Sequence, residues 1–168
     1  MSQNCYAYAV NYNDRIDPGE LSGPKYADNS DSELIRAAER DGLEFISVKD
    51  RIPPNKTGYY LVALIATSAD TSNYHWIRME LDRHWTHKAG EGSPQKHDAV
   101  EKKLKDTNPP HSANFNFQAY FTKPEKMQFL AMAQHQGWAV NYDRFVGYFY
   151  CPNGGLTKKK ASWDCVIQ

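Results

Sequence analysis

The chain has 168 residues, enough for one domain with a real hydrophobic core and too few for two comfortable ones. Its 20 lysines and arginines balance 20 aspartates and glutamates, so no overall field favours nucleic acid or a membrane surface as a partner. No run reaches the length of a membrane helix, and no basic segment followed by an apolar one marks a secretory signal. We therefore expect a cytoplasmic protein, or one delivered by a route without a signal peptide.

Three cysteines, Cys5, Cys151 and Cys165, cannot all pair within one chain, so at least one thiol is free. A free thiol favours a reducing compartment or a thiol with a chemical role. Aromatic residues make up 13% of the chain. Their amphipathic rings suit half-buried strands and a groove that holds a polar polymer.

Two helices are predicted near the start. The first begins at Ser2 or Asn4, both good N-caps, and continues to residue 12. Residues 13–25 are rich in turn formers and predict a loop. The second helix has a capping box at 30–33, an apolar stripe and Gly42 as its stop.

Strands dominate the middle of the chain. Residues 59–66 form a continuous apolar run, which predicts a central strand buried on both faces. Residues 74–81 and 84–88 flank a turn and predict an antiparallel hairpin. The polar stretch 90–113 predicts a long loop or insertion, about 93–113 of a single domain 1–168, with one short helix at 98–105.

The last third predicts a mixture of elements. Residues 115–121 alternate apolar and polar and predict a strand, while a capping box at 122–125 and Gly137 bound a third helix. Residues 140–142 and 145–151 predict two final strands around a turn. A helix followed by a mostly antiparallel sheet with helical insertions is an α+β domain.

Cys5 is the first candidate for chemistry. The thiolate is the nucleophile, and unpaired N–H groups at a helix N-terminus lower the cysteine pKa. The Cys5 backbone N–H and the Asn4 amide are candidate oxyanion donors. The alternatives are a helix cap at Asn4 and a small buried hydrophobe at Cys5.

A thiolate needs a base, and the base needs an orienting group. With a three-residue hairpin loop at 81–83, His87 lies opposite Ile77 and His75 opposite Ala89. The two histidines then share a face, about 7–8 Å apart along the backbone, and their rings can meet. A two-residue loop at 82–83 would place them on opposite faces.

Other interpretations of the histidines, acids and aromatic residues are open. His84, His87 and His97 form a possible metal cluster, but His84 and His87 point to opposite faces of a strand. Asp82 and Asp98 are turn and loop acids by default, although Asp98 becomes the orienter if His87 faces away. Three aromatic residues either pack in the core or form the wall of a substrate groove: Tyr6, Trp76 and Trp85.

The order of these features resembles that of NlpC-like peptidases, which have the papain-like fold. It consists of Cys5 at a helix start, an apolar strand, a strand opening with His75, a tight turn, and His87 before a glycine-containing loop. The resemblance implies a cysteine helix packed on an antiparallel sheet. It also implies that Cys5 is the nucleophile, His75 the base and His87 its orienter, with no cofactor and no metal.

The sequence thus predicts a papain-like thiol hydrolase that cleaves an amide or peptide bond. The resemblance implies peptidoglycan peptides as the first substrate class. Without a visible export signal, such an enzyme would be a phage product, a delivered effector or toxin with an inhibitor or immunity protein as partner, or an enzyme acting inside a cell. A deamidase or acyltransferase would use the same dyad. The alternative from another class is a non-catalytic binding or interaction module with an incidental thiol at Cys5.

Overall fold

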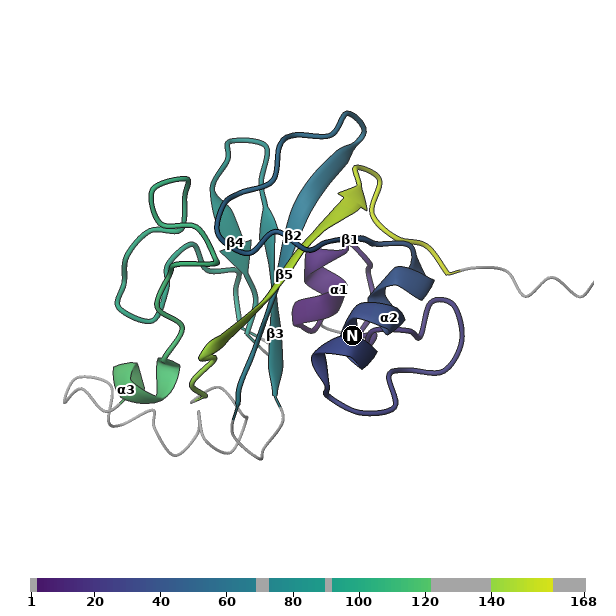
Figure 1. Cartoon of the computed structure of the whole chain (residues 1–168), viewed down its shortest axis with the longest axis horizontal. Coiled ribbons are helices and arrows are strands. Elements are labelled where there is room, and N and C mark those ends of the chain that lie inside the picture. The colour runs from purple at the N-terminus through teal and green to yellow at the C-terminus, as the bar shows by residue number, and fades with distance from the viewer. Residues whose placement is uncertain (1–2, 69–72, 90–91, 122–139, 159–168) are drawn as a thin grey trace, which may run out of the picture.

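The computed structural model describes residues 3–68, 73–89, 92–121 and 140–158, and its centre is a five-stranded antiparallel sheet (Figure 1). The strand order across the sheet is β1-β5-β2-β3-β4, and each neighbouring pair runs antiparallel. The strands are β1 (Glu44–Ile46), β2 (Tyr59–Ala66), β3 (Tyr74–Met79), β4 (Trp85–His87) and β5 (Arg144–Pro152). Together with three helices, this sheet confirms the predicted α+β class.

Strand β2 lies at the middle of the sheet, as its apolar run predicts. Its side chains alternate between two buried clusters, because successive residues of a strand point to opposite faces. Val62 and Leu64 join the cluster on one face, and Leu61 and Ala63 join the cluster on the other. Both faces of the sheet are therefore covered.

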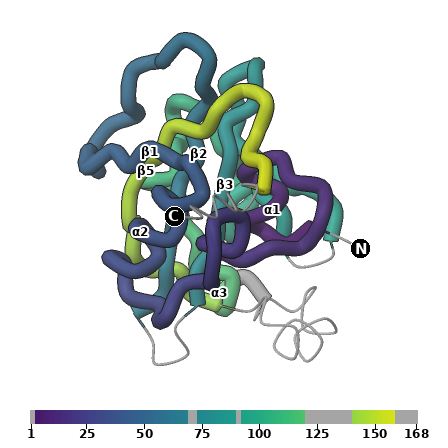
Figure 2. Tube along the Cα trace, turned by 90° about the vertical axis from the view of Figure 1, so that its right-hand side faces the viewer, coloured from purple at the N-terminus to yellow at the C-terminus, as the bar shows by residue number. Residues whose placement is uncertain are grey.

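Helices α1 (Cys5–Ala9) and α2 (Asp31–Asp41) cover one face of the sheet, the face toward the viewer in Figure 2. The cap of α2 is as predicted, since the Ser30 hydroxyl accepts from the Glu33 N–H at 3.3 Å and Gly42 ends the helix with φ of +120°. Helix α1 starts at the predicted position but has only five residues, and it ends before residue 12.

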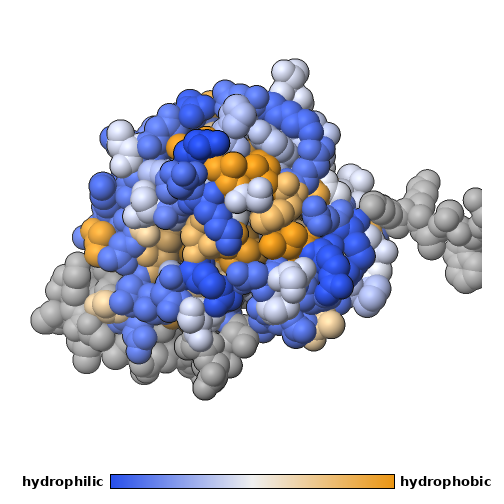
Figure 3. Space-filling model, viewed as in Figure 1, coloured by the Kyte–Doolittle hydropathy of each residue, from blue (hydrophilic) through white to orange (hydrophobic). Residues whose placement is uncertain are grey.

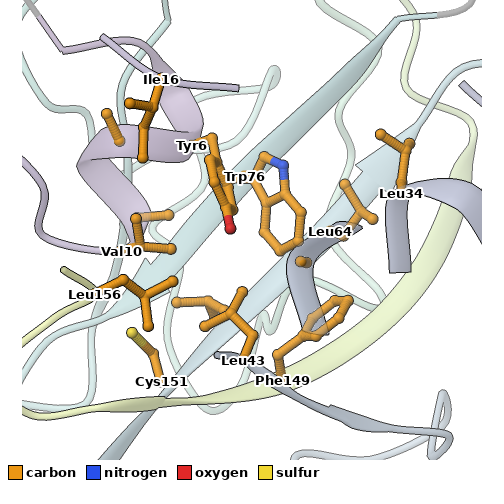
Figure 4. Close-up of a cluster of buried hydrophobic side chains, with 14 of the residues drawn as sticks. Tyr6, Val10, Ile16, Leu34, Leu43, Leu64, Trp76, Phe149, Cys151 and Leu156 are labelled. Carbon is orange, nitrogen blue, oxygen red and sulfur yellow. The ribbon is translucent and has the colours of Figure 1, made fainter. Parts of the chain in front are cut away.

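The core between α1, α2 and the sheet is aromatic and aliphatic (Figure 4). Tyr6 of α1 and Trp76 of β3 lie side by side with ring centroids 5.0 Å apart, and Phe149 of β5 packs against the same indole at 5.1 Å. Cys151 is buried at the edge of this cluster, and its thiol donates to the Tyr60 hydroxyl at 3.1 Å. We call this side of the sheet the helix face.

A segment of residues 92–117 covers the opposite side, which we call the loop face (Figure 1). The predicted helix at 98–105 is wrong, because the structure describes these residues as turns and isolated bridges that pair with one another and with β4. The predicted strand at 115–121 is also wrong. There the Asn116 side chain accepts from the Ala119 N–H at 3.1 Å, which caps the short helix α3 (Phe117–Phe121).

The C-terminal predictions are partly testable. Strand β5 contains the predicted strand 145–151, whereas residues 140–142 carry only a bridge between Asn141 and Asn116. The predicted third helix between its capping box at 122–125 and Gly137 lies outside the described residues, as does Cys165.

The surface seen from the side of Figure 1 is hydrophilic around its rim and carries apolar groups near its middle (Figure 3). Among the described residues, no helix has the length and hydropathy needed to cross a bilayer.

Candidate active site

Asn4 caps α1 and thereby places Cys5 at the first helical position. Its side-chain oxygen accepts from the Ala7 N–H at 3.0 Å, and its amide nitrogen donates to the Ile16 carbonyl at 2.7 Å and to Asp17 at 3.2 Å. The cap reading of Asn4 is confirmed. Because the amide nitrogen already has two partners, it is poorly placed to donate to an oxyanion as well.

The Cys5 sulfur lies against backbone N–H groups. Burial raises the pKa of the Cys5 thiol to about 11, while the backbone N–H of Trp76 lowers it and the Asp17 carboxylate raises it further. The N–H groups of Tyr6 and Cys5 also lower this pKa. A five-residue helix sums few peptide dipoles, so these local N–H groups, rather than a macrodipole, favour the thiolate. At neutral pH the resting group is a thiol.

The β3–β4 hairpin has the three-residue loop on which the histidine prediction depends. The Glu80 N–H donates to the His84 carbonyl at 2.8 Å, and Arg83 in between has φ of 63°. A turn of this length with a left-handed last residue is a common hairpin connection. The register therefore pairs Ile77 with His87, as predicted. The predicted pairing of His75 with residue 89 is absent from the described ladder, which ends at His87.

The two imidazoles meet on the loop face. His75 Nε2 and His87 Nδ1 are 3.0 Å apart, and the rings are almost perpendicular at 86°. On the other side of the His87 ring, Nε2 lies 2.9 Å from the backbone carbonyl oxygen of His97. His75 and His87 are 4% and 2% exposed, so both rings sit in the protein interior.

These contacts fix where the protons are. A carbonyl oxygen only accepts, so His87 Nε2 carries a hydrogen and, in a neutral ring, His87 Nδ1 is an acceptor. His75 Nε2 must then carry a hydrogen and donate to it. In neutral His75 this leaves Nδ1 without a hydrogen, as a base. The geometry thus assigns one tautomer to each ring.

Both rings are neutral at rest. Burial lowers the pKa of His75 well below its ordinary value, and the neighbouring His87 lowers it further. Burial also lowers the pKa of His87, although the His97 carbonyl opposes that shift. A neutral imidazole and a neutral thiol are the protonation states from which a general base acts, as opposed to a preformed ion pair.

The Cys5 sulfur contacts the backbone of β3 next to His75, but it is not hydrogen-bonded to the His75 ring. The sulfur lies against the backbone N–H of Trp76, the residue that follows His75. Among the described residues, no hydrogen bond joins the Cys5 sulfur to either imidazole. His75 and His87 are brought together directly, whereas the sulfur is brought only to the backbone of β3 and packs on the opposite face of the sheet from the two rings.

Tyr142 packs against His75 and was not predicted as a site residue. Its ring stacks on His75 with centroids 5.5 Å apart and an interplanar angle of 29°. Burial and the nearby Cys5 raise the pKa of the Tyr142 hydroxyl, so it stays protonated. No sequence signal marked this residue, because 140–142 read as an ordinary strand.

The predicted groove wall needs correction. Tyr6, Trp76 and Trp85 are each 0% exposed, so they pack in the two cores and cannot line an open groove in this structure. Their size and apolar neighbours on both sides of the sheet explain the burial. A surface hollow lined by Tyr12 and Lys25 lies over the loop 13–25, away from the imidazoles.

The remaining candidate residues have other partners. His84 contacts Asp82 at the tip of the hairpin, with Nδ1 and Oδ2 3.0 Å apart. His87 faces inward toward His75, so Asp98 is not needed as the direct orienter. The described residues contain no group of three or more histidine, cysteine or acidic side chains arranged to hold a metal ion.

Comparisons with known proteins give one partial likeness. The chain is 34% identical over 89 residues to a protein named insoluble matrix shell protein 1 from Ruditapes philippinarum, a match that covers 52% of this chain and 55% of that protein. The chain thus spans about half the length of this relative. No family model and no solved structure matches the chain.

Proposed function

We propose that the protein is a thiol hydrolase with a papain-like, NlpC-like fold, which cleaves an amide or peptide bond. Cys5 is the nucleophile, His75 the general base and His87 its orienting residue. The observation that carries this proposal is the 3.0 Å contact between His75 Nε2 and His87 Nδ1. It leaves His75 Nδ1 as a base on the strand that also carries the N–H beside the sulfur.

The reaction begins with a neutral pair. His75 Nδ1 takes the proton from the Cys5 thiol while the sulfur attacks the substrate carbonyl carbon. The resulting imidazolium gives the proton to the leaving amine, and an acyl-enzyme remains. Water, deprotonated by His75, then attacks the thioester and releases the acid and the thiol. The backbone N–H of Cys5 is the oxyanion donor that we retain, because the Asn4 amide already has partners.

Cys5 packs with α1 against the helix-face cluster, whereas the His75 ring lies on the loop face, so the sulfur and the imidazole must approach each other around the first residues of β3 during this cycle. Catalytic hydrogen bonds are often long in a free enzyme and tighten when substrate binds. The stack of Tyr142 on His75 keeps the ring plane fixed while this happens. We propose peptidoglycan peptides as the first substrates to test, with an effector or toxin as the biological context. A deamidase or acyltransferase would use the same first half-reaction.

The rate of alkylation by iodoacetamide tests the dyad without knowledge of the substrate. A thiol with a pKa of about 11 alkylates slowly at neutral pH unless a base removes its proton. We expect Cys5 to react roughly 10²-fold faster in the wild type than in His75→Gln. His84→Gln is the matched control, since His84 sits at the hairpin tip. Equal rates at Cys5 in the wild type and His75→Gln would rule the dyad out.

A second candidate function is a non-catalytic matrix or binding module. It is supported by the name of the partial relative, insoluble matrix shell protein 1, and by the raised pKa of Cys5. Under this proposal Cys5→Ala has no effect on any activity or binding, and Cys5 reacts at the rate of the buried Cys151. A panel of muropeptides and proteins, with Cys5→Ala as the blank, separates the two candidates.

A further inference from the structure

The covering segment on the loop face is bonded along the edge of β4. The His87 N–H donates to the Gln95 carbonyl at 3.0 Å, and the Gln95 N–H donates back to the His87 carbonyl at 2.8 Å. Further along, the Trp85 N–H donates to the Leu104 carbonyl at 3.0 Å. This segment therefore continues the sheet beyond β4 and passes directly beside the imidazole pair.

A buried carboxylate organises the turn inside this segment. Asp98 is 5% exposed, and its Oδ1 accepts from the N–H groups of Val100 at 3.1 Å and Lys102 at 2.9 Å. Its Oδ2 accepts from the Asn108 amide at 3.1 Å and from the Asn114 N–H at 3.3 Å. Four donors from three parts of the segment thus converge on one side chain.

The same residue fixes the direction of the His97 carbonyl. The His97 C=O and the Asp98 N–H belong to one planar trans peptide, in which they point in opposite directions. The Asp98 N–H donates to the Lys102 carbonyl at 2.9 Å, while the His97 oxygen lies 2.9 Å from His87 Nε2. Anything that holds the Asp98 turn therefore aims this carbonyl at His87.

We propose that Asp98 is a positioning residue, which holds the His97 carbonyl on His87 Nε2 and thereby fixes the tautomers of His87 and His75. The Asp98 carboxylate holds the peptide plane between His97 and Asp98. This plane orients the His87 ring, and His87 in turn determines that His75 Nδ1 is unprotonated. The catalytic role of Asp98 rests on the proposed thiol hydrolase activity, whereas its effect on the tautomers of His87 and His75 does not. The Asp98 charge also favours protonated His87 and raises its pKa.

The tautomers are measurable by two-bond proton–nitrogen correlation spectra of the imidazole rings at neutral pH. In the wild type we expect protonated Nε2 and unprotonated Nδ1 in both His75 and His87. Asp98→Ala removes all four acceptor contacts, and we expect His87 to become a mixture of tautomers, followed by His75. Asp106→Asn is the matched control, because Asp106 belongs to the same segment but bonds Arg83 at the surface.

Asp98→Asn keeps the test decisive if Asp98→Ala fails to fold. The amide can still accept from two N–H groups, but its nitrogen cannot accept from Asn108 or Asn114. We expect a partial mixture of tautomers and a roughly tenfold slower alkylation of Cys5, the order found for outer-shell partners of histidine ligands. In the double variant Asp98→Asn with Asn108→Asp, the amide of residue 98 donates to the carboxylate of residue 108, which restores that one contact with donor and acceptor exchanged. We expect this variant to recover part of the single-tautomer signal.

The outcomes separate this inference from the proposed function. Unchanged tautomers in a folded Asp98→Ala or Asp98→Asn protein overturn the inference, as does a mixture of tautomers in the wild type. If the tautomers respond as expected while Cys5 alkylation is the same in the wild type and His75→Gln, the positioning role of Asp98 stands and the hydrolase proposal fails.

Discussion

The two faces of the sheet are built differently, and β3 shows the difference residue by residue. Trp76 points to the helix face and is enclosed by Tyr6 and Phe149. His75, one position earlier, belongs to the loop face, where its ring partners are His87 and Tyr142. Adjacent residues of one strand thus belong to an apolar core and to a hydrogen-bonded site.

The kinds of force differ in the same way. The Trp76 indole N–H has no hydrogen-bond partner among the described residues, so Trp76 stabilises the fold through burial and packing. The imidazoles of the loop face are held by directional contacts to each other and to a carbonyl. We expect substitutions on the helix face to change stability, and substitutions near His75 to change proton positions and reactivity.

The largest expected effect is that of Trp76→Ala. Loss of a fully buried tryptophan removes a large apolar area and leaves a cavity between α1 and the sheet, which typically costs about 3–5 kcal/mol. Chemical denaturation of the wild type and the variant measures this difference. Leu81→Ala is the control, because Leu81 is fully exposed at the hairpin tip. A loss as small as that of the control would show that this core is not packed as described.

The elements that the sequence predicted well are those whose local signals agree with their tertiary surroundings. Strand β2 was predicted at its observed bounds because an apolar run of this length needs burial on both faces. Helix α2 has a cap, a stripe and a glycine stop in its own sequence. The sequence left the hairpin loop open between two and three residues; with the three-residue loop that the structure has, the register and the contact between His75 and His87 follow as predicted.

The failures have physical causes too. Residues 98–105 contain lysines and a leucine that are compatible with a helix, but a buried Asp98 carboxylate and bonds to β4 determine their conformation. The alternation at 115–121 resembled a strand, yet Asn116 starts a helix there. The bonds to β4 and the contacts of Asp98 with Asn108 and Asn114 leave no local pattern, whereas the Asn116 cap is a local signal that the apolar–polar alternation concealed.

The candidate site was predictable only in its side chains. A thiol and two imidazoles are recognisable in the sequence as a candidate nucleophile and candidate bases, as for Cys5, His75 and His87. The His97 carbonyl is a backbone group that any residue would supply, so the sequence does not mark it. Tyr142 stacks on His75 from the irregular residues before β5, a placement that depends on tertiary structure. Of the two interpretations of Tyr6, Trp76 and Trp85, the groove wall failed and core packing holds, because large aromatic side chains are highly buried on average.

The second-largest expected effect concerns Asp41, a buried carboxylate on the largely apolar helix face. Asp41 is 3% exposed and accepts from the Tyr6 hydroxyl at 2.9 Å, from the N–H groups of Gly19 and Leu21 at 2.7 and 3.1 Å, and from the Ser22 hydroxyl at 2.9 Å. Asp41→Ala leaves these buried donors unpaired, and we expect a loss of about 3 kcal/mol.

Tyr6→Phe removes only one of those donors, so we expect a loss of about 1 kcal/mol in the same denaturation experiment. Asp14→Ala is the control for Asp41→Ala, since Asp14 is exposed in the neighbouring loop. A loss for Asp41→Ala no greater than that for Tyr6→Phe would contradict the view that this carboxylate holds the loop to the helices.

The third effect is a pH dependence that belongs to the loop face. Burial lowers the pKa of His75 and of His87 below the ordinary value of 6.5. Below pH 6.5 the unfolded chain binds more protons at these residues than the folded protein does. Their contribution to stability is therefore present above pH 6.5 and is lost as pH falls toward the folded pKa values.

We expect His75→Gln to lose less stability on acidification than the wild type, measured by denaturation on either side of pH 6.5. Trp76→Ala, by contrast, should lower stability by the same amount at both pH values, because it removes no titrating group. His84→Gln is the control, since His84 is not part of the buried pair. An acid slope that is identical in the wild type and His75→Gln would mean that the imidazole is not buried as a neutral ring.

The smallest expected effect is the most specific to the loop face. The His97 side chain is exposed, and only its backbone carbonyl contacts His87. His97→Ala keeps that carbonyl, so we expect stability within about 0.5 kcal/mol of the wild type and unchanged tautomers and Cys5 alkylation. His87→Ala, ten residues away, removes the partner of His75 Nε2 and should slow alkylation at Cys5. If Cys5 were alkylated as slowly in His97→Ala as in His87→Ala, the His97 side chain would be needed to orient the His87 ring, and the backbone carbonyl would not be the group that fixes it.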